Sequence, residues 1–438
     1  MHKKLSPFFI IMLCFLGVIL LGAGLLCLPV AAAEESATFG EALFTATSAV
    51  CVTGLVVRDT ATFWSPFGQA VLLGLIQIGG LGVICAASAF VMLSGKRILL
   101  RQREILSESV SAHQVGGVMR LTGFIVAFTL IAEAIGAVLL SFRLVPLYGW
   151  EGVWMSVFTS VSAFCNAGFD LMGGKTGHFS SMMGFGSNGY VVFVLCLLII
   201  AGGLGFMTWE DILHQRRNFK KYRLQSKVIL ATTAVLLAVP FLFYFFLEFN
   251  EGPAKQRLLD AAFQTVTART AGFNTADLAA MSGGGKTVMI LLMLIGGAPG
   301  STAGGLKTTT AAMLAIVLVS QLRRKKDVEC FGRRIDDDTI KKTLSLFALY
   351  GFLFVFGAVA ISAIEGAPMG ACLFETGSAV ATVGLSLGLT PTLGLASRAI
   401  LIVLMFIGRV GGLTLILAAA SVRDNVQSRK PVEKISVG

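Results

Sequence analysis

Charged residues are scarce in this sequence: they make up 13% of its 438 positions, whereas hydrophobic residues make up 55%. Soluble proteins carry about 25% charged residues, so this composition excludes an ordinary soluble domain. The four histidines are dispersed, and none of the eight cysteines forms a CxxC pair. The sequence therefore lacks the spacing of a metal site or a disulfide framework, and we expect no cofactor in this chain.

The apolar residues form eight runs, each long enough to cross a bilayer, which takes about 20 residues. Glu133 is the only clear carboxylate in the middle of a run. A membrane enzyme would need a converging group of acids and histidines, so we do not expect an enzyme. We predict an all-α polytopic membrane protein with runs at roughly 7–30, 67–93, 121–142, 188–209, 228–247, 286–319, 344–364 and 397–420.

The first run also has features of a secretory signal, because Lys3 and Lys4 precede it and the alanines at 31–33 follow it. The apolar core of a signal peptide has about 7–15 residues, and the stretch from Phe8 to Val30 is longer. We therefore expect a retained membrane helix.

A short pattern occurs four times, each time between an odd-numbered apolar run and the next run. A phenylalanine is followed nine or ten residues later by a glycine with an apolar neighbour. These segments are too short and polar to span, so we expect re-entrant pore helices followed by extended turns. The prediction is four pseudo-symmetric outer helix–pore loop–inner helix repeats around one central pore, at 1–95, 96–215, 216–325 and 326–438. The patterns run from Phe44 to Gly54, Phe158 to Gly168, Phe263 to Gly272 and Phe374 to Gly384.

Each pattern ends in a tripeptide that we predict to be part of a selectivity filter. Successive backbone carbonyls aimed at the pore axis can replace the hydration shell of K⁺, and glycine permits the backbone angles that this requires. The alternative is a set of turns that merely reverse the chain. The tripeptides are Val52-Thr53-Gly54, Asn166-Ala167-Gly168, Thr270-Ala271-Gly272 and Thr382-Val383-Gly384.

The even-numbered runs share a second pattern, Gly-Gly-Leu, which allows close packing or a kink. We read it as marking inner helices along one pathway. The copies are Gly79-Gly80-Leu81, Gly202-Gly203-Leu204, Gly304-Gly305-Leu306 and Gly411-Gly412-Leu413.

The third inner run is interrupted by clustered glycines and a proline, so it cannot be one continuous helix. A nucleotide-binding P-loop is a poor match, because Leu306 intervenes before Lys307 and no strand precedes the segment. We predict an intramembrane gate loop under the filter. The predicted gate residues are Gly296, Gly297, Pro299, Gly300, Gly304, Gly305, Lys307 and Arg409.

Charges within the membrane are costly and call for a role. Arg409 either acts in the pathway or forms a structural ion pair with Glu133, and Lys307 either belongs to the gate or extends to the cytoplasm. Arg269, inside a pore loop, is expected to pair with an acid such as Glu375 or Asp260. Asp170 and Asp277 either concentrate cations at the outer mouth or are solvated loop residues.

Most of the 35 lysines and arginines fall in the segments that do not hold pore loops. By the positive-inside rule, both termini are cytoplasmic and the pore loops open outward. The basic residues include Lys96, Arg97, Arg216 and Arg323, spread over separate segments without a nucleic-acid-binding motif. We expect contact with anionic membrane lipids and none with nucleic acid.

The chain resembles the Ktr/Trk/HKT superfamily of potassium transporters, especially the bacterial KtrB-type membrane subunit. The resemblance rests on the four pore loops, the stretch Thr-Ala-Arg-Thr-Ala-Gly-Phe-Asn-Thr at 267–275, the glycine-rich interruption and Arg409. The resemblance implies a homodimer with one pore per subunit and a cytosolic nucleotide-binding regulatory subunit, a KtrA-like ring. It also places Arg409 below the filter, beside the loop, as an electrostatic barrier.

The Trk branch carries extra N-terminal helices, whereas this chain begins at repeat one, which favours Ktr. In the superfamily a serine in place of the first filter glycine goes with Na⁺ transport, and here all four positions are glycine. We therefore expect K⁺ uptake across the bacterial plasma membrane through a multi-pass protein. The alternatives are a secondary transporter coupled to Na⁺ or H⁺, or a Na⁺-conducting pore of the same architecture.

Overall fold

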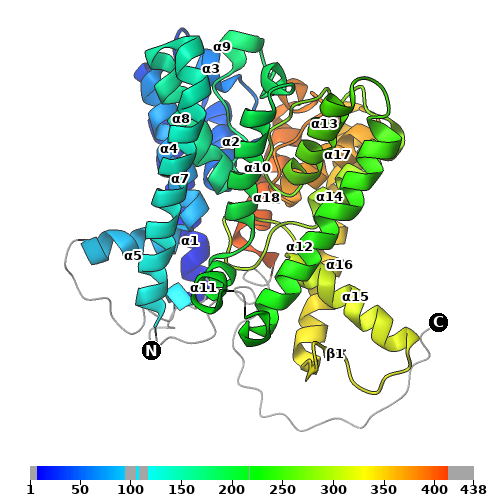
Figure 1. Ribbon diagram of the computed structural model, residues 1–438. Coiled ribbons are helices and arrows are strands. Elements are labelled where there is room, and N and C mark those ends of the chain that lie inside the picture. The colour runs from blue at the N-terminus through cyan, green and yellow to red at the C-terminus, as the bar shows by residue number, and fades with distance from the viewer. Residues whose placement is uncertain (1–6, 94–104, 108–116, 217, 413–438) are drawn as a thin grey trace.

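The computed structural model describes residues 7–93, 105–107, 117–216 and 218–412 (Figure 1). Helices dominate this part of the chain, and its strands form one small antiparallel hairpin, β1 (Glu329–Cys330) with β2 (Arg333–Arg334). The all-α prediction is therefore confirmed. The predicted boundary at 95/96, with Lys96 and Arg97, lies outside the described residues.

Each repeat begins with a long outer helix. In the described residues, four helices are long and apolar enough to cross a membrane, and these are the outer helices. Their lipid-facing sides carry large exposed side chains such as Phe142 and Phe352. The outer helices are α1 (Pro7–Leu26), α7 (Val118–Tyr148), α12 (Leu224–Phe243, continued by the π turn η4, Tyr244–Glu248) and α16 (Asp337–Glu365).

The pore helices lie together in one half of the molecule, away from α5, α11 and α15 (Figure 1). The first begins with a capping box in which Thr38 and Glu41 bond each other's backbone N–H groups. The phenylalanine that opens each predicted pattern is fully buried in its pore helix. The pore helices are α2 (Phe39–Val50), α8 (Trp150–Cys165), α13 (Ala254–Thr267) and α17 (Met369–Val380).

Three of the four inner helices are broken, although the sequence predicted a break in the third only. The first and second bend by 98° at short interruptions, which brings the candidate spans to six at most among the described residues. The third is split by an extended loop, and the fourth ends at Val410. The segments are α4 (Pro66–Leu81) with α5 (Val83–Leu93), α10 (Gly189–Gly203) with α11 (Phe206–Gln215), α14 (Gly283–Leu294) with α15 (Thr308–Leu322), and α18 (Leu395–Val410).

The bends occur at glycines in the left-handed region. Gly82 (φ 83°), Gly205 (φ 85°) and Gly411 (φ 93°) occupy matching places at the ends of α4, α10 and α18. Glycine adopts these angles without a steric penalty. In the fourth repeat the helix ends at Gly408–Gly411, one helical turn before the predicted Gly411-Gly412-Leu413, of which Leu413 lies outside the described residues.

The third Gly-Gly-Leu copy does not correspond to the first two, although its glycines lie in the interrupted segment where the sequence placed the predicted gate. Gly304, Gly305 and Leu306 lie in the extended loop and not on an inner helix. The matching of the Gly-Gly-Leu copies between repeats is thus wrong for the third and fourth repeats.

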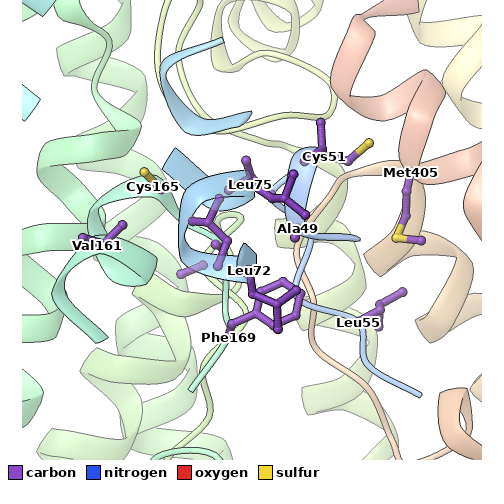
Figure 2. Close-up of a cluster of buried hydrophobic side chains, with 14 of the residues drawn as sticks. Ala49, Cys51, Leu55, Leu72, Leu75, Val161, Cys165, Phe169 and Met405 are labelled. Carbon is purple, nitrogen blue, oxygen red and sulfur yellow. The ribbon is translucent and has the colours of Figure 1, made fainter. Parts of the chain in front are cut away.

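Inner and pore helices pack at van der Waals distance wherever an inner-helix glycine meets a pore-helix carbonyl. A Cβ on Gly202 would lie 1.9 Å from the Phe164 oxygen, and one on Gly79 would lie 2.2 Å from the Val50 oxygen. Leu72 and Leu75 of α4 lie between Val161 and Cys165 of α8 and Ala49 of α2 (Figure 2). The ends of α2 and α8 that lead into the tripeptides are therefore tightly packed against inner helices.

Short elements complete the described part of the chain. The helical ones are α3 (Thr60–Phe63) and α9 (Gly173–Thr176), and the 3₁₀ turns are η1 (Pro29–Ala31), η2 (Met183–Phe185), η3 (Phe219–Lys221) and η5 (Thr390–Thr392).

We predict that Gly202→Ala destabilises the fold, because the added methyl would overlap the Phe164 carbonyl and the Thr302 hydroxyl. The expected loss is about 1–3 kcal/mol, measured as a lower melting temperature in detergent. Gly123→Ala is the control, since nothing lies within 4 Å of that site. Equal melting of the two variants would contradict the packing described above.

Candidate functional site

The four predicted filter tripeptides form a closed ring. Each glycine backbone lies against a carbonyl oxygen of the next repeat, and the fourth repeat contacts the first. The contacts are so close that an added Cβ would lie between 2.1 and 2.9 Å from that oxygen. All twelve predicted residues are therefore brought together. The contacts join Gly54 to Ala167, Gly168 to Ala271, Gly272 to Val383 and Gly384 to Thr53.

The sign of the backbone angle φ alternates along each tripeptide. The first and third residues have positive φ and the middle residue does not. Alternation of left- and right-handed conformations turns successive N–H groups to one side and carbonyls to the other. Such angles cost about 1–3 kcal/mol at a non-glycine residue, so they persist only where the surroundings enforce them. The first-residue φ values are 55° for Val52, 59° for Asn166, 73° for Thr270 and 53° for Thr382.

A serine near the end of the pore helix accepts hydrogen bonds from backbone N–H groups of the strand. In repeat one, Thr53 N–H donates to the Ser48 carbonyl (2.8 Å) and Gly54 N–H donates to the Ser48 hydroxyl (3.0 Å). Because these N–H groups face the helix, the carbonyls face the ring. Ser378 accepts from Val383 and Gly384 in the same way. In repeat two the Ser162 carbonyl accepts from Ala167 N–H, but its hydroxyl accepts from Phe169 N–H, one residue beyond the filter glycine.

The sequence analysis did not predict a role for these hydroxyls, although the sequence contains a pattern that points to them. A serine or threonine stands four residues after the opening phenylalanine in every repeat: Ser48, Ser162, Thr267 and Ser378.

Repeat three is held differently, because its loop is one residue shorter. The Thr267 carbonyl accepts from Ala271 N–H (3.0 Å), but the Thr267 hydroxyl donates to the Phe273 carbonyl (2.5 Å) instead of accepting from a filter N–H. The ring is therefore only pseudo-symmetric.

On one side of the ring lies a cavity of ≈ 320 Å³, lined by all four filter glycines together with Asp59 and Asp170. Asp59 was not predicted, whereas Asp277 lies outside this lining and accepts from the Ala279 N–H. Burial raises the pKa of Asp170 to about 6, and the Asp59 carboxylate acts in the same direction. Asp170 is therefore charged at neutral pH and becomes neutral in mild acid.

The extended loop between α14 and α15 lies against the ring on its other side. A Cβ on Gly304 would lie 2.1 Å from the Thr382 hydroxyl, so the loop touches the fourth filter strand directly. Gly305 N–H donates to the Gly408 carbonyl (3.1 Å). A hydrogen bond joins the two ends of the loop, in which Gly296 N–H donates to the Leu306 carbonyl (2.7 Å).

The loop is also fixed to the second repeat. Ala298 N–H donates to the Gly203 carbonyl (2.9 Å), and Phe206 N–H donates to the Gly300 carbonyl (2.8 Å). Because these partners flank the bend between α10 and α11, the loop and the bend share hydrogen bonds.

Arg409 connects the loop to the first repeat. Its guanidinium donates to the carbonyls of Thr302 in the loop, Gly79 and Gly80, the last at 3.3 Å. It makes no contact with Glu133, whose carboxylate accepts from Gln77 (3.1 Å). The alternative of an Arg409–Glu133 ion pair is therefore wrong.

Below the loop lies a second cavity, of ≈ 650 Å³, lined by Gly80, Gly300, Gly305, Lys307 and Arg409, among others. No filter residue lines this cavity, so the loop stands between it and the ring. The Lys307 ammonium donates to the Ala303 carbonyl (2.7 Å) within the loop.

Arg269 does not pair with either predicted acid. Glu375 accepts from Ser386 and Thr390, and Asp260 accepts from Gln256. In the residues that the structure describes, no three His, Cys, Asp or Glu side chains gather to hold a metal ion. The oxygens grouped at the ring are those of the backbone.

The chain is similar to known transport proteins over nearly its whole length. A family model described as TrkH, Cation transport protein, matches residues 7–429. The Potassium/sodium uptake protein NtpJ of Enterococcus hirae is 41% identical, over 100% of this chain and 98% of the relative. The Ktr system potassium uptake protein B of Bacillus subtilis is 39% identical, over 96% of this chain and 95% of the relative.

Among solved structures, the potassium transporter TrkH from Vibrio parahaemolyticus has a similar fold. The TM-score is 0.75 at 19% identity, over 96% of this chain and 86% of the other.

We expect Ser378→Ala to lower the K⁺-over-Na⁺ flux ratio severalfold in liposomes. The substitution leaves the Gly384 N–H without its partner at 2.9 Å, which costs about 1–3 kcal/mol when the group is buried. Thr376→Val is the matched control, because the Thr376 hydroxyl bonds only carbonyls of its own helix. If both variants keep the wild-type ratio, the serine does not set the strand.

Cation uptake should fall as the pH on the outer-cavity side drops from about 8 to about 5, since a carboxylate with a raised pKa loses its charge in that window. The charge of Asp170 is present above a pH of about 6 and lost below it. Asp170→Asn should give a lower and flatter profile. Asp277→Asn, outside the cavity, should keep the wild-type profile, and a flat wild-type profile would contradict the role of Asp170.

Proposed function

Because the chain belongs to the TrkH family of cation transport proteins, we propose that it takes up K⁺ across the bacterial plasma membrane through the ring of four filter strands. The observation that carries this proposal is the ring itself. Four strands close on one another, with N–H groups tied to pore helices and carbonyls left to face a cation. A carbonyl ring of this kind replaces the hydration shell of an ion.

K⁺ is the preferred ion in this proposal for two reasons. The relatives are named as potassium uptake proteins, and glycine stands at the third position of every strand. The name of the E. hirae relative includes sodium, so Na⁺ passage through the same ring is the second candidate.

The proposed gate is the loop between α14 and α15, with Arg409 as an electrostatic barrier. The loop lies between the ring and the inner cavity, and Arg409 holds it to the first repeat. A fixed positive charge on the path of a cation raises the barrier to permeation. Motion of this one loop would then connect the two cavities.

The orientation follows from the basic residues at the loop side of the molecule, such as Lys220 and Arg323. Both termini are proposed to be cytoplasmic, with the ring opening outward. Three relatives are named as parts of a Ktr system, which supports a further subunit, and we propose that this subunit is cytosolic and binds a nucleotide. A homodimer with one pore per subunit completes the proposed assembly.

The proposal is tested by cation flux into liposomes that contain the purified protein, at a clamped membrane potential. Uptake of K⁺ and Rb⁺ well above Na⁺, following the potential, is the expected result. Equal Na⁺ flux favours the second candidate. Uptake that requires a Na⁺ or H⁺ gradient, and does not follow the potential, would contradict a pore and indicate a coupled transporter.

Gly54→Ser should relax K⁺ selectivity. Gly54 has φ 93°, and any Cβ there would lie 2.5 Å from the Ala167 carbonyl, so the ring must widen locally. Gly74→Ser, where nothing lies within 4 Å, should leave the flux ratio unchanged. If the Gly54 variant still excludes Na⁺, Gly54 is not a residue of the selectivity filter.

Deletion of residues 297–303 should raise K⁺ flux and weaken its dependence on a cytosolic partner. The deletion joins Gly296 to Gly304, whose backbones already touch, since a Cβ on Gly296 would lie 2.3 Å from the Gly304 oxygen. A deletion variant that folds normally and conducts less than wild type would refute the gate.

A further inference from the structure

Arg269 is a buried cation without a counter-ion. It directly precedes Thr270, the first residue of the third filter strand, and Arg269 is 8% exposed. In the described residues, its guanidinium forms no ion pair or hydrogen bond, and its Nε is buried without a partner. The other membrane-embedded arginine, Arg409, has three carbonyl partners, so Arg269 is unlike it.

Arg269 lines a small cavity, which residues of α10, α12 and the loop between α14 and α15 also line. Its volume is ≈ 10 Å³, which is about the volume that one water molecule needs. Thr233 of α12 and Gly297 of the loop also line it, and the remaining lining is largely aliphatic. The Thr233 hydroxyl is buried and has no hydrogen-bond partner.

Two residues with unpartnered polar groups thus line one small cavity. A buried charge without a partner costs several kcal/mol, whereas a paired one is tolerated. No carboxylate lines the cavity. The guanidinium also stands next to the strand at which a cation is to be coordinated, and its uncompensated charge would repel that cation.

We propose that this cavity binds a single monatomic anion, chloride, between the Arg269 guanidinium and the Thr233 hydroxyl. The ion neutralises Arg269 beside the third filter strand. It also joins that strand to α12 and to the gate loop at Gly297. Larger anions such as gluconate do not fit the cavity. The site goes beyond the proposed transport, since its occupancy can be measured without any cation flux.

The first test is the melting temperature of the purified full-length protein in detergent. KCl and KBr are compared with potassium gluconate at equal ionic strength. The protein should melt higher in the halides, because a ligand that binds only the folded state stabilises it. Arg269→Gln and Thr233→Val should remove or reduce that difference. Arg257→Gln is the control, because Arg257 donates to the Phe249 and Phe245 carbonyls elsewhere.

The second test holds even if Arg269→Gln fails to fold. Crystals of the wild-type protein in KBr should give an anomalous bromine peak between Arg269 and Thr233. A wild-type protein that melts equally in halide and gluconate would overturn the proposal. So would a bromide crystal whose cavity holds only non-anomalous density, that of a water molecule.

Discussion

The direction of the backbone N–H groups in the four filter strands decides what this protein can do. A peptide group that sends its N–H to one side sends its carbonyl to the other. In repeats one and four, a serine of the pore helix accepts hydrogen bonds from two of these N–H groups, and in repeat two Ser162 accepts from one of them and from the Phe169 N–H that follows. This fixes left-handed angles at Val52, Asn166 and Thr382 that are costly in isolation. The carbonyls of these strands are thereby directed away from the pore helices.

The rest of the fold holds these strands in place. Glycines of the inner helices meet the pore-helix carbonyls, and Gly82 and Gly205 lie at the 98° bends of the first and second inner helices. Breaks of this kind also occur in coupled transporters. Here, however, the breaks at Gly82 and Gly205 lie on the loop side, and the place where all four repeats meet is the ring. The interruption in the third repeat shares hydrogen bonds with the residues that flank the bend at Gly205.

The sequence predicted the four repeats, their pore helices and the twelve residues of the ring, because a phenylalanine and a glycine at fixed spacing report a local structure. The Gly-Gly-Leu match failed in the third and fourth repeats. Gly408, Arg409 and Gly411 take the places held elsewhere by Gly79, Gly80 and Gly82, and dipeptide identity does not reveal such a shift. The predicted ion pair of Arg269 with Glu375 or Asp260 was also wrong. The presence of acids in the sequence does not reveal which of them a given side chain will contact in the fold.

Anomalous diffraction from crystals grown in Rb⁺ tests the central claim most directly. Rubidium is close to K⁺ in size and marks the positions at which the protein replaces its hydration shell. The account predicts peaks inside the ring, between the carbonyls of the strands that end at Gly54, Gly168, Gly272 and Gly384. Peaks confined to the carboxylates of Asp59 and Asp170, with none inside the ring, would contradict it.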